Sequence, residues 1–169
     1  VGAEVICTPV SSNTAVDAMG FAAVHRTRIG SPFVIAAMEA LPGARVAGYE
    51  ANGGFLLGFD ASGPAGPLPP LMTRDSVLPI VAPLARANTA GQSLADLVAT
   101  LPPRFTAADR LQGIATEAAQ AFLSALRESA TRRAAFFDTL PPEAGVDETD
   151  GLRVTFEGGE VVHLRPSGN

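Results

Sequence analysis

Apolar strand-like runs alternate with helix-spaced apolar positions through the first part of the chain. Polar residues at positions 12–14 can cap a helix that begins near Ala15, and Ser31 followed by Pro32 is a favourable helix start. The order strand, helix, strand, helix, strand predicts an α/β domain with a mixed or parallel sheet. The predicted strands are residues 5–7, 23–27 and 55–57, and the predicted helices are residues 15–21 and 31–41.

Proline and glycine then interrupt this pattern. Residues 60–70 are so rich in both that we expect no regular structure there, only a surface loop. A helix is predicted at residues 76–87, with Pro79 in its first turn and a kink or break at Pro83. Its apolar face is expected to pack on the sheet. Apolar positions between residues 94 and 101 predict one more helix.

After residue 101 the pattern predicts helices followed by strands, in place of alternating strands and helices. Thr106 can cap a helix, and the helix-spaced apolar positions that follow predict two helical segments. Two strand-like runs are then joined by the hairpin turn Glu157-Gly158-Gly159-Glu160. We therefore predict a smaller α+β domain with an antiparallel hairpin at residues 102–169, after the α/β domain at residues 1–101. The helices are placed at residues 107–113 and 116–137 and the strands at residues 152–156 and 161–164.

Composition narrows the classes of function. The 169 residues are 47% hydrophobic, which is enough to build a core. The net charge is −5 and the basic residues are scattered, so the chain lacks the basic surface of a nucleic-acid-binding protein. Cys7 is the only cysteine, a usage typical of a reducing compartment, and no apolar run approaches the ~20 residues that cross a membrane. We expect a cytoplasmic protein with no nucleic-acid or membrane partner.

Both ends of the chain lie close to predicted elements. The sequence begins without methionine at Val1, just before the first strand, and only a short polar turn follows the last strand. We expect a fragment whose first domain is truncated at its N-terminus and whose second domain is truncated at its C-terminus.

The glycine-rich turn after residue 49 is the most informative local feature. Glu50 is a hydrogen-bond acceptor, Asn52 is both donor and acceptor, and the glycines at residues 53 and 54 let the backbone approach a ligand closely. This combination suits a polyhydroxylated ligand. The alternative is an ordinary tight connection in which Glu50 is solvated. His25 and His163, the only histidines, have no partner at metal-ligand spacing, so no metal site is predicted.

Four segments of the chain also carry a family resemblance, in the same order and over nearly the whole length. Together they resemble the C-terminal part of the α-D-phosphohexomutases, phosphomannomutases most of all. They match that family's third-domain opening, its sugar-recognition loop, the helix start that follows, and its fourth-domain phosphate-binding region. The segments are Thr8-Pro9-Val10-Ser11-Ser12-Asn13 with residues 26–31, Gly48-Tyr49-Glu50-Ala51-Asn52-Gly53-Gly54, Thr73-Arg74-Asp75, and residues 150–154 through 165–169.

The resemblance implies an intramolecular phosphotransferase that interconverts hexose 1-phosphate and hexose 6-phosphate through hexose 1,6-bisphosphate. It also implies a phosphoserine and one Mg²⁺, held in earlier domains of such proteins. Neither motif occurs in this sequence, so we expect the isolated chain to be inactive and to need the missing N-terminal domains as partners. The alternative is a non-catalytic module that binds sugar phosphates or serves as a scaffold.

The resemblance further implies which residues recognise the ligand. Glu50, Asn52 and Gly53 would hold the hydroxyls of a mannose or glucose phosphate. A terminal clamp would hold its unreacted phosphate, and Arg26 would assist near the reacting phosphate, unless it is only a surface arginine. The family's loop usually has serine where Asn52 stands and histidine where Gly54 stands, which leaves the preferred hexose open. The clamp residues are Arg165, Ser167, Gly168 and Asn169.

Overall fold

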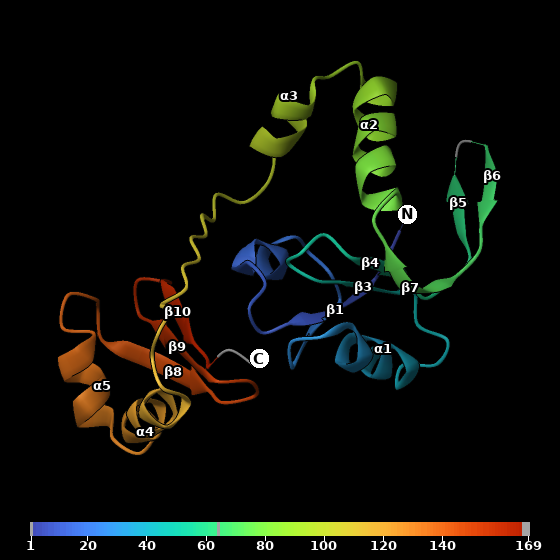
Figure 1. Ribbon diagram of the computed structural model, residues 1–169. Helices are drawn as coiled ribbons and strands as arrows, with labels where there is room; N and C mark the ends of the chain where they lie inside the picture. The colour runs from blue at the N-terminus through green and yellow to red at the C-terminus, as the bar shows by residue number, and fades with distance from the viewer. Residues whose placement is uncertain (1, 64, 167–169) are drawn as a thin grey trace. The chain divides into compact units, whose positions relative to one another are not determined.

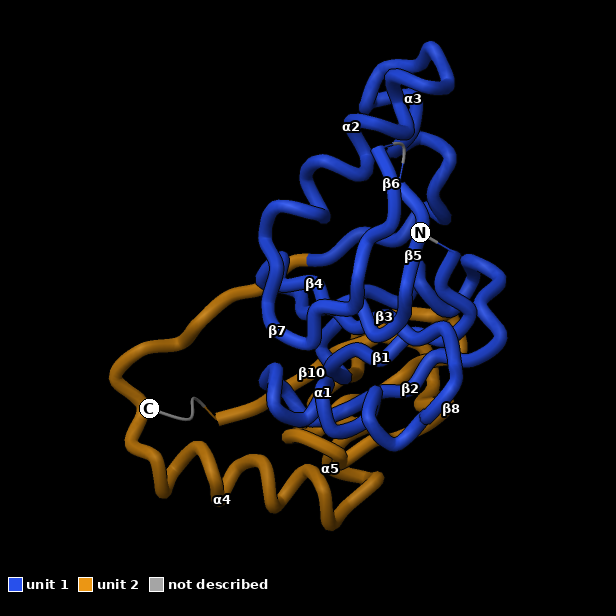
Figure 2. Tube along the Cα trace, turned by 90° about the vertical axis from the view of Figure 1, so that its right-hand side faces the viewer, with its two compact units in different colours: residues 1–106 blue, residues 107–169 orange. Residues whose placement is uncertain are grey.

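The computed structural model describes residues 2–63 and 65–166. The chain divides into two compact units, residues 1–106 and residues 107–169, which are treated separately below (Figure 2). This division falls five residues beyond the predicted boundary at residue 101.

Unit 1 is built on a five-stranded sheet with the order β2-β1-β3-β4-β7 (Figure 1). β1 (Val5–Pro9) lies between β2 (Ala23–Thr27) and β3 (Val46–Tyr49) and is parallel to both. β4 (Phe55–Leu57) and β7 (Leu71–Asp75) extend the sheet in antiparallel pairing. The mixed α/β sheet predicted from the sequence is therefore confirmed.

Each face of this sheet has its own apolar cluster. Helix α1 (Ser31–Glu39) covers one face with Val34 and Met38, which pack against Cys7 and its neighbours on the sheet. On the other face Val16, from the 3₁₀-helix η1 (Thr14–Ala18), packs against Ile6 and Ala47. The expected cap at Asn13 is present, since its side chain accepts a hydrogen bond from Ala15 N at 2.7 Å, but it starts a 3₁₀ turn rather than a full helix.

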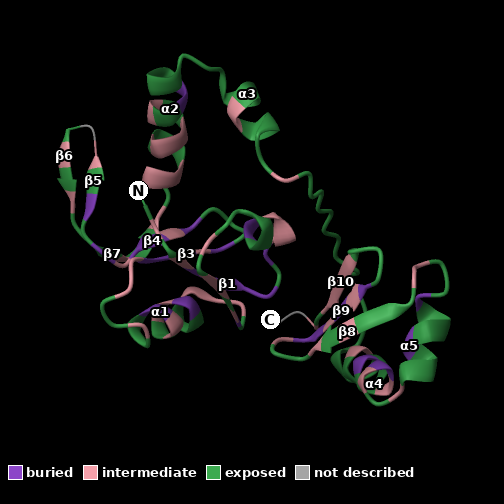
Figure 3. Ribbon diagram, turned by 180° about the vertical axis from the view of Figure 1, so that it is seen from behind, coloured by how far each residue is buried: buried purple, intermediate pink, exposed green. Residues whose placement is uncertain are grey.

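One prediction for the next segment is wrong, and another holds only in part. Residues 60–70 were expected to be an irregular loop, yet they contain the antiparallel pair β5 (Ala61–Gly63) and β6 (Gly66–Leu68). Pro67 is tolerated because an isolated two-stranded ribbon has free edges, where a missing N–H breaks no ladder. Helices α2 (Leu78–Ala90) and α3 (Leu94–Ala99) form near their predicted positions, and α2 continues through Pro83 without a break. The apolar side chains of α2 pack on the sheet only in part: Leu78 packs against the cluster that contains Leu57 of β4, whereas Ile80 and Val81 are exposed. Figure 3 shows that much of α2 is exposed or half-buried.

Unit 2 joins two helices to a three-stranded antiparallel sheet. The predicted helix at residues 116–137 is interrupted, because the Ser129 side chain accepts a hydrogen bond from Arg132 N and starts a second helix. The helix expected at residues 107–113 is absent, and Leu111 there is 78% exposed, so no packing supports a helix. The elements are α4 (Thr116–Arg127), α5 (Ala130–Phe136), β8 (Glu143–Asp147), β9 (Leu152–Phe156) and β10 (Val161–Leu164), in the sheet order β10-β9-β8.

The core of unit 2 lies between these helices and the sheet. Leu123 and Leu126 of α4 pack against Leu152 and Val154 of β9. Arg133 is a charged side chain at the edge of this core and is nearly buried. Its guanidinium forms a bidentate pair with Glu143 at 2.6 and 2.9 Å, and it also donates to the Leu126 carbonyl at the end of α4. This pair therefore fastens α5 to both α4 and β8.

Candidate functional site

The predicted sugar-binding loop lies at the carboxyl ends of the parallel strands of unit 1. Ligands of open α/β sheets commonly bind at this edge. β1 ends near Thr8, whose hydroxyl oxygen is 3.0 Å from the Tyr49 carbonyl oxygen and 2.6 Å from Ser12 Oγ. These buried contacts join the turn after β1 to the end of β3 and so fix the residue that follows, Glu50.

Backbone hydrogen bonds close the turn from Glu50 to Gly54. Glu50 N donates to the Gly54 carbonyl at 2.9 Å, and Gly53 N donates to the Glu50 carbonyl at 3.0 Å. Asn52 Oδ1 accepts from Gly54 N at 3.1 Å, so the amide oxygen serves the turn itself. Gly53 has φ +90°, a conformation that side-chain-bearing residues rarely adopt. The turn is therefore a tight, defined connection between β3 and β4.

The Glu50 carboxylate is buried, with only 7% of its side chain exposed. It is not the solvated turn residue of the alternative interpretation. Its Oε2 atom has no hydrogen-bond partner among the described residues, and its charge is balanced by Arg74, whose Nε lies 3.6 Å away. A buried carboxylate oxygen without a donor costs free energy, of the order of 1–3 kcal/mol. Glu50 therefore keeps an unused hydrogen-bond acceptor beside the loop.

A cavity of about 340 Å³ opens at this loop and is lined by Asn52, Gly53, Gly54, Arg74 and Ser76. The structure therefore brings two of the predicted site residues, Asn52 and Gly53, to one cavity beside Glu50. Sequence reasoning did not select Arg74, because residues 73–75 were interpreted as a helix start. They instead end strand β7, and the Asp75 side chain accepts a hydrogen bond from Val77 N at 2.7 Å in the turn that leads into α2.

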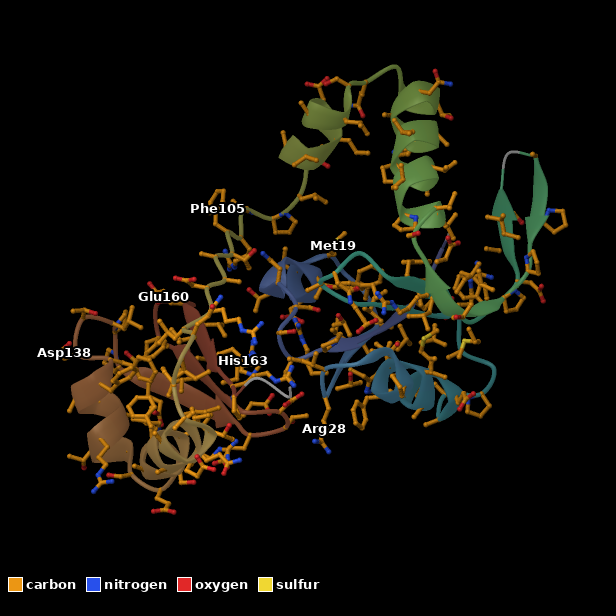
Figure 4. The ribbon with its side chains drawn as sticks, in the orientation of Figure 1. Met19, Arg28, Phe105, Asp138, Glu160 and His163 are labelled. Atoms are coloured by element: carbon orange, nitrogen blue, oxygen red, sulfur yellow. The ribbon has the colours of Figure 1, made fainter. Side chains whose placement is uncertain are left out.

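A second, larger cavity of about 670 Å³ in unit 1 has a mostly apolar lining that includes Met19, Phe21, Tyr49, Phe55 and Phe105. Figure 4 labels Met19 and Phe105. This larger cavity lacks the convergent charged and polar groups that a sugar phosphate requires. The loop at Glu50 is therefore the better candidate for the binding site.

Two arginines at the end of β2 differ in how they are held. Arg26, the predicted assisting residue, donates to both carboxylate oxygens of Asp17 at 2.9 and 2.8 Å and to the Ser12 carbonyl at 2.8 Å. Arg28 follows β2 and is exposed, with its guanidinium carbon 5.0 Å from the centre of the Phe33 ring (Figure 4). Arg28 was not selected from the sequence. Of these two arginines it is the one whose side chain is exposed to solvent.

The described part of the predicted phosphate clamp lies in unit 2. Arg165 Nε is 3.5 Å from Asp150 Oδ1. The backbone beside it is held at two points, because a ring nitrogen of His163 hydrogen-bonds the Asp150 carbonyl and Arg127 donates to the Gly151 carbonyl at 2.9 Å. Ser167, Gly168 and Asn169 lie outside the described residues. The phosphate-binding role of all four residues stays a prediction.

Gly151 sets the local geometry of this region. Its φ of +87° is unfavourable for any residue with a side chain. A Cβ at this position would also collide with the Leu164 carbonyl oxygen and come within 2.7 Å of Arg165 Cβ. The absence of a side chain at Gly151 therefore lets the Asp150 turn lie directly against Arg165.

Neither unit shows a metal centre in the part of the chain that the structure describes: no group of three or more histidine, cysteine, aspartate or glutamate side chains there could hold an ion. Nor is any helix in residues 2–63 or 65–166 long and apolar enough to cross a membrane.

Unit 1 is thus an α/β domain with a polar loop at the carboxyl ends of its parallel strands, and comparison with known proteins identifies its family. Residues 2–105 match the family described as phosphoglucomutase/phosphomannomutase, alpha/beta/alpha domain III. The chain belongs to this family. The resemblance inferred from the four sequence segments is therefore confirmed.

Two curated relatives are phosphomannomutases. One, from Sinorhizobium fredii, is 42% identical over 170 residues, which cover 99% of this chain and 36% of that protein. The other, from Salmonella muenchen, is 37% identical over 176 residues, covering all of this chain and 36% of that protein. The chain thus spans about a third of the length of these relatives.

A solved structure supports the fold. The crystal structure of a Thermus thermophilus protein, provisionally assigned as a phosphomannomutase, superposes with a TM-score of 0.57 at 16% identity. The match covers 98% of this chain and 31% of that one. At this identity the likeness concerns architecture alone, and it agrees with an α/β domain followed by a smaller one.

Proposed function

We propose that the chain is the hexose-recognition part of a phosphohexomutase, most closely a phosphomannomutase, which interconverts hexose 1-phosphate and hexose 6-phosphate. The observation that carries the proposal is the buried Glu50 carboxylate with an unpartnered oxygen, set on a glycine turn at a ligand-binding sheet edge. The family match and the phosphomannomutase relatives support the same assignment.

In this proposal Glu50 accepts hydrogen bonds from sugar hydroxyls, while Asn52 and the Gly53 backbone border the ring. A mutase must hold its substrate in two opposite orientations, and a carboxylate beside an amide can hold vicinal hydroxyls in either one. Arg165, with residues 167–169, would hold the phosphate that does not react, because a guanidinium matches phosphate geometry in a bidentate manner. Arg28 would add positive charge near the reacting phosphate, and Arg26, whose own charge is paired with Asp17, would assist from beside it.

The phosphotransfer itself is assigned to parts of a longer protein. The described residues contain no donor set that fits Mg²⁺, and no role proposed for them involves the metal. We propose that the metal, the phosphoserine and the exchange through hexose 1,6-bisphosphate belong to the two thirds of the relatives' length that this chain does not span. The 169-residue chain alone is expected to bind and not to turn over.

Calorimetric or NMR titration of the purified chain with mannose 1-phosphate and glucose 1-phosphate tests this assignment. We expect weak, millimolar binding, reduced at least about 10-fold by Glu50→Gln, because a hydrogen bond to a charged group contributes about 1.5–3 kcal/mol. Glu39→Gln, an exposed glutamate on α1, is the matched control and should bind normally. Mutase turnover by the isolated chain, or equal affinity of the wild type and the Glu50→Gln variant, would contradict the proposal.

A further inference from the structure

Arg74 reaches the sugar-binding loop through the pairing of two antiparallel strands. The antiparallel register sets Phe55, the first residue of β4, opposite Asp75, the last residue of β7, so Gly54 and Arg74 both lie at this end of the strand pair. The Arg74 side chain is 56% exposed and lines the cavity at the loop, so its guanidinium is accessible to a ligand there.

Gly54 is the residue that makes room for this arginine. Gly54 is buried, and a Cβ built on it would lie 3.2 Å from both Cγ and Nε of Arg74, closer than side chains normally approach. Its backbone φ is not in the left-handed region, so conformational freedom does not explain a glycine here. The Arg74 side chain instead occupies the space that a side chain at position 54 would need.

The spacing of Arg74 and Glu50 leaves both groups short of a direct hydrogen bond. Their closest atoms, Nε and Oε2, are 3.6 Å apart. A ligand hydroxyl about 2.8 Å from each atom would satisfy both, because it can donate to the carboxylate and accept from the guanidinium. A phosphate group fits this position poorly, since a buried carboxylate at such a distance would repel a second anion.

We propose that Arg74 is a second hexose-contacting residue, which donates to the ring hydroxyls that the Glu50 carboxylate accepts from. This inference rests on the proposed function of the loop, and it adds a specificity-determining residue to it. Arg74 and Gly54 act as a pair: the arginine supplies from β7 a polar group that the loop does not supply at position 54. The recognised part of the ligand is a hydroxyl of a hexose phosphate, not its phosphate.

The test compares the affinity of the chain for mannose 1-phosphate, glucose 1-phosphate and inorganic phosphate. The variants are Arg74→Gln, Arg74→Lys, Gly54→Ala and Glu50→Gln, with Arg86→Gln, an exposed arginine of α2, as the matched control. We expect Arg74→Gln to weaken hexose 1-phosphate binding about 5- to 10-fold and to leave inorganic phosphate binding unchanged. Arg74→Lys should restore affinity only in part, since lysine keeps the charge but not the planar fork of donors.

Gly54→Ala supplies an independent arm. Arg74 is long and half-exposed, so it can swing away from a new methyl group without unfolding the strand pair. We expect a small change in melting temperature and a loss of hexose affinity similar to that of Arg74→Gln. The double variant should lose little more than either single variant, because both act on one contact.

The outcomes separate this inference from the proposed function. If Glu50→Gln loses hexose affinity while Arg74→Gln keeps it, Arg74 only balances the Glu50 charge and the inference is wrong. Full affinity in Arg74→Lys, together with a lowered melting temperature in Arg74→Gln, would point to the same conclusion. If the wild-type chain binds no hexose phosphate, or Glu50→Gln has no effect, the proposed function fails first.

Discussion

Replacement of Gly151 by alanine perturbs the turn that supports Arg165. Two separate effects oppose the substitution. The φ of +87° would be imposed on a residue with a side chain, and the new methyl group would collide with the Leu164 carbonyl oxygen. Because the colliding atom belongs to the backbone of β10, no side-chain rotation relieves the contact, and the start of β9 must separate from the end of β10.

The expected magnitude follows from the sum of these effects. A left-handed conformation costs a non-glycine residue about 1–2 kcal/mol, and overpacking of a tight site typically costs about 1–3 kcal/mol. Gly151→Ala should therefore destabilise unit 2 by roughly 2–5 kcal/mol. A unit of this size has a total free energy of unfolding of only about 3–9 kcal/mol at typical values per residue. The variant is therefore expected to lose a large part of the stability of unit 2.

Gly159→Ala is the matched control. Gly159 has φ +89°, nearly the same conformation, but a Cβ there would meet no atom within 4 Å. Native-state hydrogen exchange at Leu152 and Val154, whose side chains are buried in unit 2, would measure both variants in the full 169-residue chain. We expect about 1–2 kcal/mol for Gly159→Ala and clearly more for Gly151→Ala. Equal losses would refute the argument that backbone contact at Arg165 requires glycine.

Three further predictions follow from buried groups. The hydrogen bonds and charge of Arg133 lower the pKa of Glu143 from its ordinary value of 4.5. The ionised Glu143 carboxylate should therefore stabilise the fold fully above pH 4.5, and this stabilisation should be lost as the pH falls through the lowered pKa. Acid titration of stability should show the loss in the wild type and a smaller one in Glu143→Gln. Gly48→Ala should destabilise unit 1 by about 1–3 kcal/mol in denaturant unfolding. The new Cβ would lie 2.5 Å from Met38 Sδ and 2.6 Å from Val34 Cγ1, and both of these side chains are buried. A loss below about 0.5 kcal/mol, which is typical of a surface substitution, would contradict this prediction. Burial raises the pKa of the Cys7 thiol, so a thiol reagent should modify it only after unfolding, and rapid labelling of the native chain would show that β1 opens.

Much of the fold was predictable because it follows local patterns. The apolar runs of β1 and β2, the cap at Asn13 and the hairpin around Gly159 each depend on neighbours in sequence. The same kind of reasoning missed β8, a five-residue strand with only two apolar side chains, Ala144 and Val146, both of which are exposed. That strand forms at a sheet edge by pairing with β9, with Glu143 held by Arg133 from α5.

In the candidate site, too, the residues that are close in sequence could be predicted and the contact between distant residues could not. Glu50, Asn52 and Gly53 could be selected from sequence because a single turn contains them. The contact between Glu50 and Arg74 could not, because the two residues lie far apart in the sequence and their approach depends on the register of β4 against β7. Arg74 was not selected because residues 73–75 were interpreted as a helix start. Asp75 does cap the turn into α2, but it is the last residue of strand β7, and Arg74 belongs to that strand.

The most direct measurement is an NMR titration of the isotope-labelled chain with mannose 1-phosphate, followed at each backbone amide. The account predicts that the amides of Gly53 and Gly54 shift on titration and that these shifts vanish in Glu50→Gln. Shifts that leave this turn untouched, or that persist unchanged in the variant, would contradict the assignment of the Glu50 loop as the sugar-binding site.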